Sequence, residues 1–382
     1  VNACDAGREG ELIFRLVYEM TGCRKPILRL WISSMEDSAI REGFSDLRPG
    51  ADYEALYQSA LCRQKADWLV GINATRLFSV LYHRTLNVGR VQTPTLAMLA
   101  DRDTKITLFH KEKYHLLRLT LNGAEAVSEK FTDPAEAEQA AAACKGAVAT
   151  CTSVTKEQKK EQPPKLYDLT TLQREANRLF GYTAKQTLDY AQSLYEKKLL
   201  TYPRTDSRYL TSDMEETASC VIHLAAKLPP FDGCTNFFPL VEVMISDKDV
   251  SDHHAIIPTM EIEKADIKAL PLGERNLFLL VCCKLLCASA EPYVYEAVTA
   301  TFDCGGHSFT AKGKRILSEG WREIDRIFRA FLKEKPADGD GGTLPDFTEG
   351  QTFDGTEVSV TEHFTQPPKP YTEDLSLIHI SE

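Results

Sequence analysis

The sequence predicts a multidomain protein that combines an α/β segment, helical domains and a β-rich domain. Residues 1–20 have the pattern of a strand end, a tight loop and a helix, because apolar residues recur at helical spacing after the loop. Apolar and polar residues alternate in residues 113–132 and again in residues 294–316, which indicates strands. Residues 166–292 are predicted to be helical. The simplest interpretation is one β domain interrupted by a helical insertion, whose two strand connections would allow it to swing as a lid.

Local signals define the remaining elements. Residues 53–81 carry an apolar stripe at helical spacing, and residues 156–164 and 335–342 have the composition of linkers. Turns and helix ends are indicated by the hairpin pairs Asn122-Gly123 and Gly305-Gly306, the helix start at Asp133-Pro134, and the glycines Gly146 and Gly181. Three capping boxes are predicted: Thr170 with Gln173, Thr183 with Gln186, and Ser212 with Glu215.

The net charge of −10 would by itself count against a nucleic-acid partner. The acidity is concentrated in residues 334–382, which hold 11 acidic and 2 basic residues. Residues 1–333 hold 44 acidic and 43 basic residues, so the body of the chain is nearly neutral and can still carry a basic groove. The charge therefore neither supports nor excludes DNA as a partner.

The cysteines and apolar runs indicate a cytoplasmic protein. The 11 cysteines are scattered and form no CxxC pair, so we expect reduced thiols and no zinc site. The longest apolar run, residues 277–283, is too short to span a bilayer, and no signal peptide is visible. Because Val1 falls in what reads as the end of a strand, we expect further residues upstream of it.

Residues 194–210 contain the strongest candidate for catalysis. Tyr202 follows a short apolar run and precedes Pro203, which favours extended backbone at the tyrosine. A tyrosine can act as a nucleophile, but its phenol has a pKa of about 10 and needs cationic neighbours or a proton acceptor. Arg204 and Arg208 flank Asp206 close by, and arginine forks suit phosphodiester oxygens. The alternative is a tyrosine packed under a turn, with the arginines in surface ion pairs.

The same residues carry a resemblance to a known family. Leu-Thr-Tyr-Pro-Arg-Thr-Asp-Ser-Arg-Tyr-Leu, at residues 200–210, resembles the active-site segment of type IA DNA topoisomerases, nearest to their bacterial topoisomerase III branch. Tyr202 occupies the position of the family's strand-cleaving tyrosine. Other segments resemble the same family in the same order, up to residue 374; the last residues, 375–382, do not fit its pattern.

An acidic loop lies near the N-terminus, at residues 5–11. Carboxylates in a loop after a strand suit Mg²⁺, although an acidic first helical turn is the equally ordinary alternative. The loop resembles the Asp-x-Asp-x-Glu motif of the family's Toprim domain, with Asp5 and Glu9 as the first and third acids and metal ligands. Gly7 replaces the middle acid, so Glu11 or water would have to fill the gap. The family's catalytic glutamate and lysine would lie upstream of Val1.

Residues 63–90 are the most basic part of the body, with Asp67 as the one acidic residue. Such a patch suits phosphates, although a solvated helix face is the more common explanation. Residues 88–95 resemble the family's Gly-Arg-Val-Gln segment, which binds single-stranded DNA. The resemblance implies DNA contacts from Arg90, Gln92 and Thr93, and a structural role for Asp67.

Residues 252–259 contain adjacent histidines, which by themselves indicate a turn with one exposed side chain. They resemble the family's His-x-Ala-Ile-x-Pro segment, in which the first histidine lies near the scissile phosphate. The resemblance therefore makes His253 a candidate catalytic residue.

The resemblance implies an ATP-independent breakage and rejoining of single-stranded DNA through a 5′-phosphotyrosine at Tyr202. The catalytic residues besides Tyr202 would be Arg204, His253 and Glu9: Arg204 would stabilise the phosphate charge, His253 would donate a hydrogen bond, and Mg²⁺ on Asp5 and Glu9 would position the 3′ end. Asp206 and Arg208 would contact DNA. No Gly-x-x-x-x-Gly-Lys loop for a nucleoside triphosphate is present. We expect a monomer in the bacterial cytoplasm, associated with nucleoid or plasmid DNA and with no membrane partner.

The resemblance also implies a torus of domains. These are part of a Toprim domain (1–48), a helical base domain (49–108), a β-rich arch (109–162 and 293–350), a helical domain with the tyrosine (163–292), and a return to the base (351–382). Two alternatives remain open: a Toprim-type metal-dependent nuclease or primase, and a non-catalytic fragment that binds single-stranded DNA.

Overall fold

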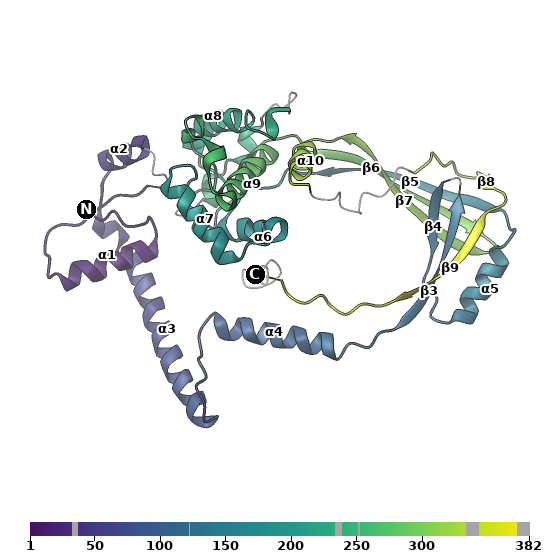
Figure 1. The fold of residues 1–382 in the computed structure, drawn as a ribbon, viewed down its shortest axis with the longest axis horizontal. Coiled ribbons are helices and arrows are strands. Elements are labelled where there is room, and N and C mark those ends of the chain that lie inside the picture. The colour runs from purple at the N-terminus through teal and green to yellow at the C-terminus, as the bar shows by residue number, and fades with distance from the viewer. Residues whose placement is uncertain (33–36, 122, 234–238, 251–252, 334–343, 373–382) are drawn as a thin grey trace. The chain divides into compact units, whose positions relative to one another are not determined.

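The computed structural model describes residues 1–32, 37–121, 123–233, 239–250, 253–333 and 344–372 (Figure 1). The chain divides into two compact units. The first comprises Val1–Asp103, Pro164–Ala290 and Pro370–Glu382, and the second comprises Thr104–Pro163 and Glu291–Lys369. The predicted linker at 335–342 lies outside the described residues.

The second unit is built on a seven-stranded antiparallel sheet with the strand order β8-β5-β6-β7-β4-β3-β9 (Figure 1). The strands before the helical block are β3 (Lys113–Leu121), β4 (Ala124–Ser128) and β5 (Ala149–Glu161). Those after it are β6 (Tyr293–Cys304), β7 (His307–Ser318), β8 (Thr352–Phe353) and β9 (Glu357–Phe364). The strands predicted from alternation are confirmed, and the two halves of the sequence share one sheet.

The core of this unit lies between the sheet and α5 (Pro134–Cys144), which packs against β3 and β9. Asp133 caps α5 as predicted, because its side chain accepts a hydrogen bond from the amide of Ala135. Gly305, at the β6–β7 hairpin, has a positive φ of 60°, and a Cβ there would lie 2.5 Å from the Ala143 carbonyl oxygen. Only glycine therefore fits this turn.

Two sequence expectations for this unit need correction. Residues 156–161 form the second half of β5, paired with β6, and are not a linker. Among the described residues β8 pairs only with the start of β5, so this half lies there at the sheet edge, where charged side chains protect against unwanted pairing. The helix α10 (Trp321–Phe331) was not predicted, although its buried Ile324 and Phe328 follow helical spacing.

The described residues before the β-rich sheet form two short strands and four helices, the last of which extends from the first unit into the second. In chain order these are α1 (Arg8–Met20), β1 (Leu28–Arg29), α2 (Asp37–Ser45), β2 (Arg48–Pro49), α3 (Glu54–Leu81) and α4 (Gln92–Thr107). The predicted helix at 53–81 is confirmed as α3. It packs against α1 through the buried side chains of Leu12, Tyr57 and Ala60.

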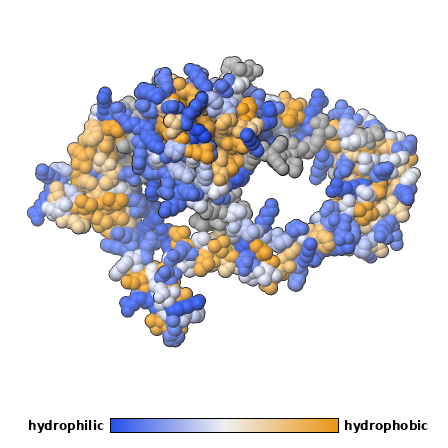
Figure 2. Space-filling model, viewed as in Figure 1, coloured by the Kyte–Doolittle hydropathy of each residue, from blue (hydrophilic) through white to orange (hydrophobic). Residues whose placement is uncertain are grey.

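Several large apolar side chains of α3 face solvent in the described part of the chain, and hydrophobic atoms are visible at the surface of this helix in Figure 2. They are Trp68, Leu69, Val70, Ile72, Leu77, Phe78, Val80 and Leu81. None of the helices among the described residues combines the length and the apolar character needed to cross a membrane.

The helical block contains α6 (Leu169–Phe180), α7 (Ala184–Glu196), α8 (Glu215–Ala225) and α9 (Leu272–Ala288). Short 3₁₀ turns lie between the helices of this block, at Ser212–Met214, Phe231–Gly233, Val241–Met244, Asp247–Asp249, Met260–Glu263 and Ile267–Ala269. A further 3₁₀ turn, Gly50–Tyr53, precedes α3. The apolar run at 277–283 lies in the middle of α9 and is buried, as expected of a helix that is apolar on all sides.

One of the three predicted capping boxes forms. Thr183 and Gln186 exchange hydrogen bonds at the start of α7. At α6 the cap is Asp168, whose carboxylate accepts from the amide of Thr171, so Thr170 already lies inside the helix. Ser212 begins a 3₁₀ turn, and α8 starts after it without a side-chain cap.

Candidate active site

The segment that carries Tyr202 is held by residues 253–259, which lie between α8 and α9 in the sequence. The amide of Thr201 donates to the Ile257 carbonyl at 3.0 Å, and the amide of Thr259 donates to the Leu199 carbonyl at 3.1 Å. These backbone hydrogen bonds pair the two segments over residues 199–201, directly before the tyrosine. The pairing fixes the backbone at Tyr202 although it lies outside regular secondary structure.

Hydroxyl side chains add a second set of hydrogen bonds. Those of Thr201, Thr205 and Ser207 donate to the carbonyls of Ala255 (3.2 Å), His253 (2.9 Å) and Asp249 (2.9 Å). The Thr and Ser residues of the motif therefore satisfy backbone groups in the interior. They hold the tyrosine in a defined position.

Tyr202 is 7% exposed, and its hydroxyl donates a hydrogen bond to Asp5 Oδ2 at 2.9 Å. The ring packs against the His253 ring, with centroids 4.3 Å apart, and against Tyr195 edge to face at 5.4 Å. The structure thus joins three segments that are distant in the sequence: the acidic loop, the tyrosine segment and the histidine pair.

The environment of Tyr202 favours the protonated phenol. Burial raises its pKa, and the charge of Asp5 and the hydrogen bond to it raise the pKa further, while the Arg204 guanidinium opposes them. Because the pKa is well above the ordinary value of about 10, the hydroxyl keeps its proton at neutral pH. Asp5 is the hydrogen-bond acceptor of this hydroxyl.

His253 is buried beside Tyr202, and its ring stacks on Trp31 with centroids 6.4 Å apart. Burial lowers the pKa of His253 to about 4, so the ring is neutral at pH 7. His254 is also buried, which corrects the expectation that one of the two histidines is exposed. Both adjacent side chains can be buried because residues 253–259 run through the interior.

The sequence interpretation missed Arg29, which organises the loop that carries Asp5. This arginine is fully buried, and its guanidinium donates to the carbonyls of Cys4 (2.7 Å) and Asp5 (2.5 Å). It also lies over the Trp31 ring at 5.1 Å from the centroid. A charged residue between apolar neighbours in 28–31 was the signal available in the sequence.

The predicted metal ligands are only partly assembled. Glu9 is exposed and pairs with Arg63, with Nη1 and Oε1 3.1 Å apart, while Asp5 accepts the Tyr202 hydrogen bond. Glu11 cannot replace the missing middle acid, because it is buried and accepts from Asn2 at 2.6 Å. Among the described residues no group of three or more His, Cys, Asp or Glu side chains is arranged to hold a metal ion.

The donor chemistry of the two carboxylates, Asp5 and Glu9, matches a water-rich Mg²⁺ site. Mg²⁺ usually takes one or two protein carboxylates and completes its shell with water and phosphate oxygens. Gly7 has extended backbone, and a Cβ added there would meet no atom within 4 Å. The position of the missing acid is therefore open.

The predicted DNA-contact residues lie on two segments. Arg90 precedes α4 and pairs with Asp67 of α3, with Nε and Oδ1 2.7 Å apart, while Gln92 and Thr93 are exposed in the first turn of α4. Arg204 and Asp206 are exposed on the tyrosine segment, and Arg208 is half-buried.

The family model described as "DNA topoisomerase" matches residues 51–380. Among curated proteins, the chain is similar to DNA topoisomerase 3 of Bacillus licheniformis (40% identical, over 99% of this chain and 53% of the relative) and of Bacillus subtilis (39%, over 99% and 53%). The chain thus spans about half the length of the curated relatives that it matches. Full-length topoisomerase I of Thermotoga maritima shares the fold, with a TM-score of 0.78 at 24% identity, over 99% of this chain and 62% of that one.

Proposed function

This chain belongs to the type IA DNA topoisomerase family, and from that premise we propose that it carries the centre that cuts and rejoins single-stranded DNA. The observation that carries the proposal is the hydrogen bond from the Tyr202 hydroxyl to Asp5. It joins a phenol, which can act as a nucleophile, to a carboxylate that can accept its proton, next to Arg204. The alternative functions, a nuclease or a primase, assign no role to this contact.

Cleavage proceeds by attack of the Tyr202 oxygen on a backbone phosphorus. The new bond joins phosphorus to the tyrosine oxygen, the bond to the 3′ oxygen breaks, and that oxygen takes a proton from water and leaves as a 3′-hydroxyl. Asp5 takes the phenol proton as the oxygen attacks, because the raised pKa of Tyr202 disfavours a free phenolate. Arg204 stabilises the charge on the phosphate oxygens, and neutral His253 donates a hydrogen bond to them. Rejoining is the reverse reaction, which explains why no nucleoside triphosphate is required.

We assign Mg²⁺ to Asp5 and Glu9 as its protein ligands. The bound ion would supply positive charge at the phosphate and help to place the 3′ end. Within the same proposal, Arg90, Gln92, Thr93, Asp206 and Arg208 contact the DNA strand. The protein acts as a monomer on nucleoid or plasmid DNA in the bacterial cytoplasm, with residues 1–48 as part of a Toprim domain and the domains arranged as a torus.

The decisive test is the capture of a covalent adduct. Wild-type protein and the Tyr202→Phe variant are incubated with labelled single-stranded DNA and Mg²⁺, then denatured and resolved by size. We expect a 5′-linked protein–DNA adduct with the wild type, complete loss of it with Tyr202→Phe, and unchanged DNA affinity. A Tyr209→Phe variant is the matched control and should keep the adduct. Hydrolysed DNA without an adduct would refute the proposal.

A further inference from the structure

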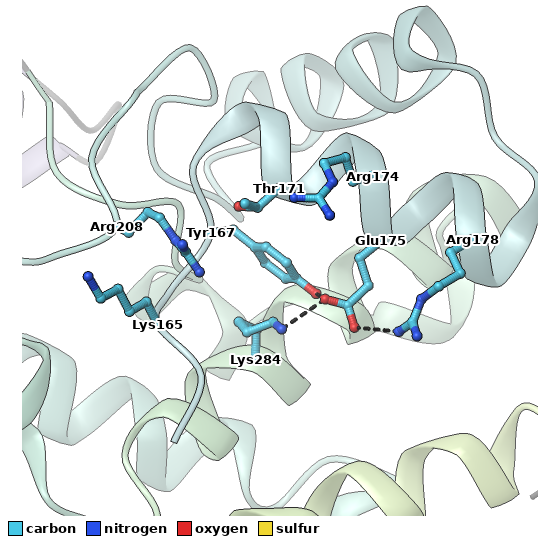
Figure 3. A pocket seen from close by; sticks show the side chains of 8 residues that line it. All are labelled: Lys165, Tyr167, Thr171, Arg174, Glu175, Arg178, Arg208 and Lys284. Atoms are coloured by element: carbon cyan, nitrogen blue, oxygen red, sulfur yellow. Dashed lines mark hydrogen bonds and ion pairs between the residues drawn. The ribbon is translucent and has the colours of Figure 1, made fainter. Parts of the chain in front are cut away.

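A cavity of about 330 Å³ opens in the helical block beside the tyrosine segment (Figure 3). Five cationic side chains line it: Lys165, Arg174, Arg178, Arg208 and Lys284. They come from four places in the chain, namely the stretch before α6, α6 itself, the tyrosine segment and α9. In Figure 3 the side chains of Arg174 and Arg208 reach toward the space around Tyr167.

The cavity carries far more positive than negative charge. Its one acidic lining residue, Glu175, is held by Lys284 at 2.8 Å and by Arg178 at 3.2 Å, and it also accepts a hydrogen bond from the Tyr167 hydroxyl at 2.6 Å. The carboxylate therefore belongs to the fixed wall of the cavity. The excess of cations is the feature that attracts an anion with several oxygens.

The cations are held by neighbouring groups and do not simply extend into solvent. Arg208 Nε donates to the Leu166 carbonyl at 3.3 Å, and the Lys165 ammonium lies 4.8 Å from the Tyr209 ring centroid. Arg174 and Arg178 are four residues apart on α6, so they project from one face of the helix. Guanidinium forks placed in this way match the geometry of phosphate oxygens.

The cavity is tied to the active-site segment at two points. Arg208 lies six residues after Tyr202, and the amide of Leu169 at the start of α6 donates to the Thr205 carbonyl at 3.0 Å. The wall of the cavity and the backbone that carries the nucleophile therefore form one hydrogen-bonded structure.

We propose that this cavity binds backbone phosphates of single-stranded DNA, as an anchoring site separate from the Tyr202–Asp5 site. This inference rests on the proposed function, which supplies the DNA. The cavity recognises the phosphate chain and not the bases, because its lining offers cations while the Tyr167 ring is buried beneath them.

The test is the salt dependence of DNA binding by the whole chain. A labelled oligothymidylate is titrated with the wild type, with Lys165→Gln, Arg174→Gln and the double variant, and with Lys268→Gln as an exposed lysine outside the cavity. Each lost phosphate contact should reduce the slope of log affinity against log salt by about 0.7, and the double variant should lose about 1.4. Lys165→Arg should restore the slope, and thermal melting checks that each variant is folded.

Inorganic tripolyphosphate distinguishes a strand from a free phosphate compound. If the double variant loses tripolyphosphate binding but binds the oligonucleotide with the wild-type affinity and slope, the cavity serves a free polyphosphate and the DNA assignment is wrong. A folded double variant whose slope equals that of Lys268→Gln also overturns it.

Adduct formation at saturating DNA separates this inference from the proposed function. We expect the double variant to form the adduct once DNA is saturating, because Tyr202 and Asp5 are unchanged. If the double variant binds DNA more weakly and the wild type forms no adduct, the cavity proposal is supported and the cleavage proposal is refuted. If the double variant binds DNA normally and the adduct also forms normally, the cleavage proposal is supported and the cavity proposal is refuted.

Discussion

The two sites at the ends of residues 202–208 differ in the charge of the side chains that form them. Around Tyr202 the phenol is protonated, His253 is neutral and both rings are buried. Around Arg208 five cations line an open cavity with one carboxylate. The difference shows that one short segment can border both a buried, neutral pair of rings and a cluster of cations, because its hydroxyls satisfy backbone carbonyls between them.

This contrast has a physical basis. Charge is costly to bury without a partner, so the buried Tyr202 and His253 side chains stay neutral. Exposed cations remain hydrated until a polyanion replaces the water and counterions. The first site is therefore suited to chemistry and the second to binding, and four variants test this division.

The largest effect is expected for Asp5→Asn. The amide cannot take the phenol proton, so the rate of adduct formation should fall by about 10²–10⁴-fold, the usual range for general acid–base catalysis. DNA affinity and its salt slope should stay at the wild-type values, since the cavity cations are untouched. Single-turnover kinetics with labelled DNA measures the rate, and a fall of less than about tenfold would remove Asp5 from the role of proton acceptor.

The next effect concerns stability. Arg29→Met should lower the free energy of unfolding by about 3–5 kcal/mol, because buried carbonyls and the nearby Glu11 lose their cationic partner. Arg178→Gln at the cavity is the matched control and should cost less than about 1 kcal/mol, since its ion pair is half-exposed. Chemical denaturation measures both, and equal losses would contradict the contrast between the two sites.

The third effect is the pH dependence that His253 contributes to stability. The pKa of His253 is about 4 in the folded state and about 6.5 when unfolded, so the unfolded chain binds more protons between these values. Stability should therefore fall as the pH is lowered from 6.5 to 4, by up to about 3 kcal/mol from this residue.

His253→Gln should flatten this part of the stability curve. The curve should not become level, because the pKa of His254 is also lowered by burial. Denaturation at a series of pH values compares the wild type with His253→Gln and His254→Gln. A His253→Gln curve parallel to that of the wild type would show that the ring is not held neutral.

The smallest effect on stability is expected for Gly7→Asp. The backbone there is extended and the space is open, so the free energy of unfolding should change by less than about 0.5 kcal/mol. The added carboxylate should lower the Mg²⁺ concentration that supports half-maximal adduct formation. Gly7→Asn controls for the side chain without the charge. An unchanged Mg²⁺ requirement would argue against a metal site in this loop.

Local patterns predicted much of the secondary structure. The Thr183 capping box, the Gly181 helix end and the alternating strands all form, because each depends on residues close in the sequence. The predictions failed where distant residues decide. Residues 156–161 look like a linker until β6 pairs with them, and Asp168 takes the cap that was predicted for Thr170. The predicted domain boundaries and the roles of the site residues stay predictions.

The sequence by itself determined which residue types were available: a tyrosine before proline with arginines after it, an acidic loop with a glycine in the middle, and a histidine pair. Only the tertiary structure decided that Asp5 lies against the Tyr202 hydroxyl, that Arg29 fixes its loop, and that cations from four places share one cavity. The physical reason is that burial, pKa and charge density depend on distances through space, and a linear pattern does not specify these distances.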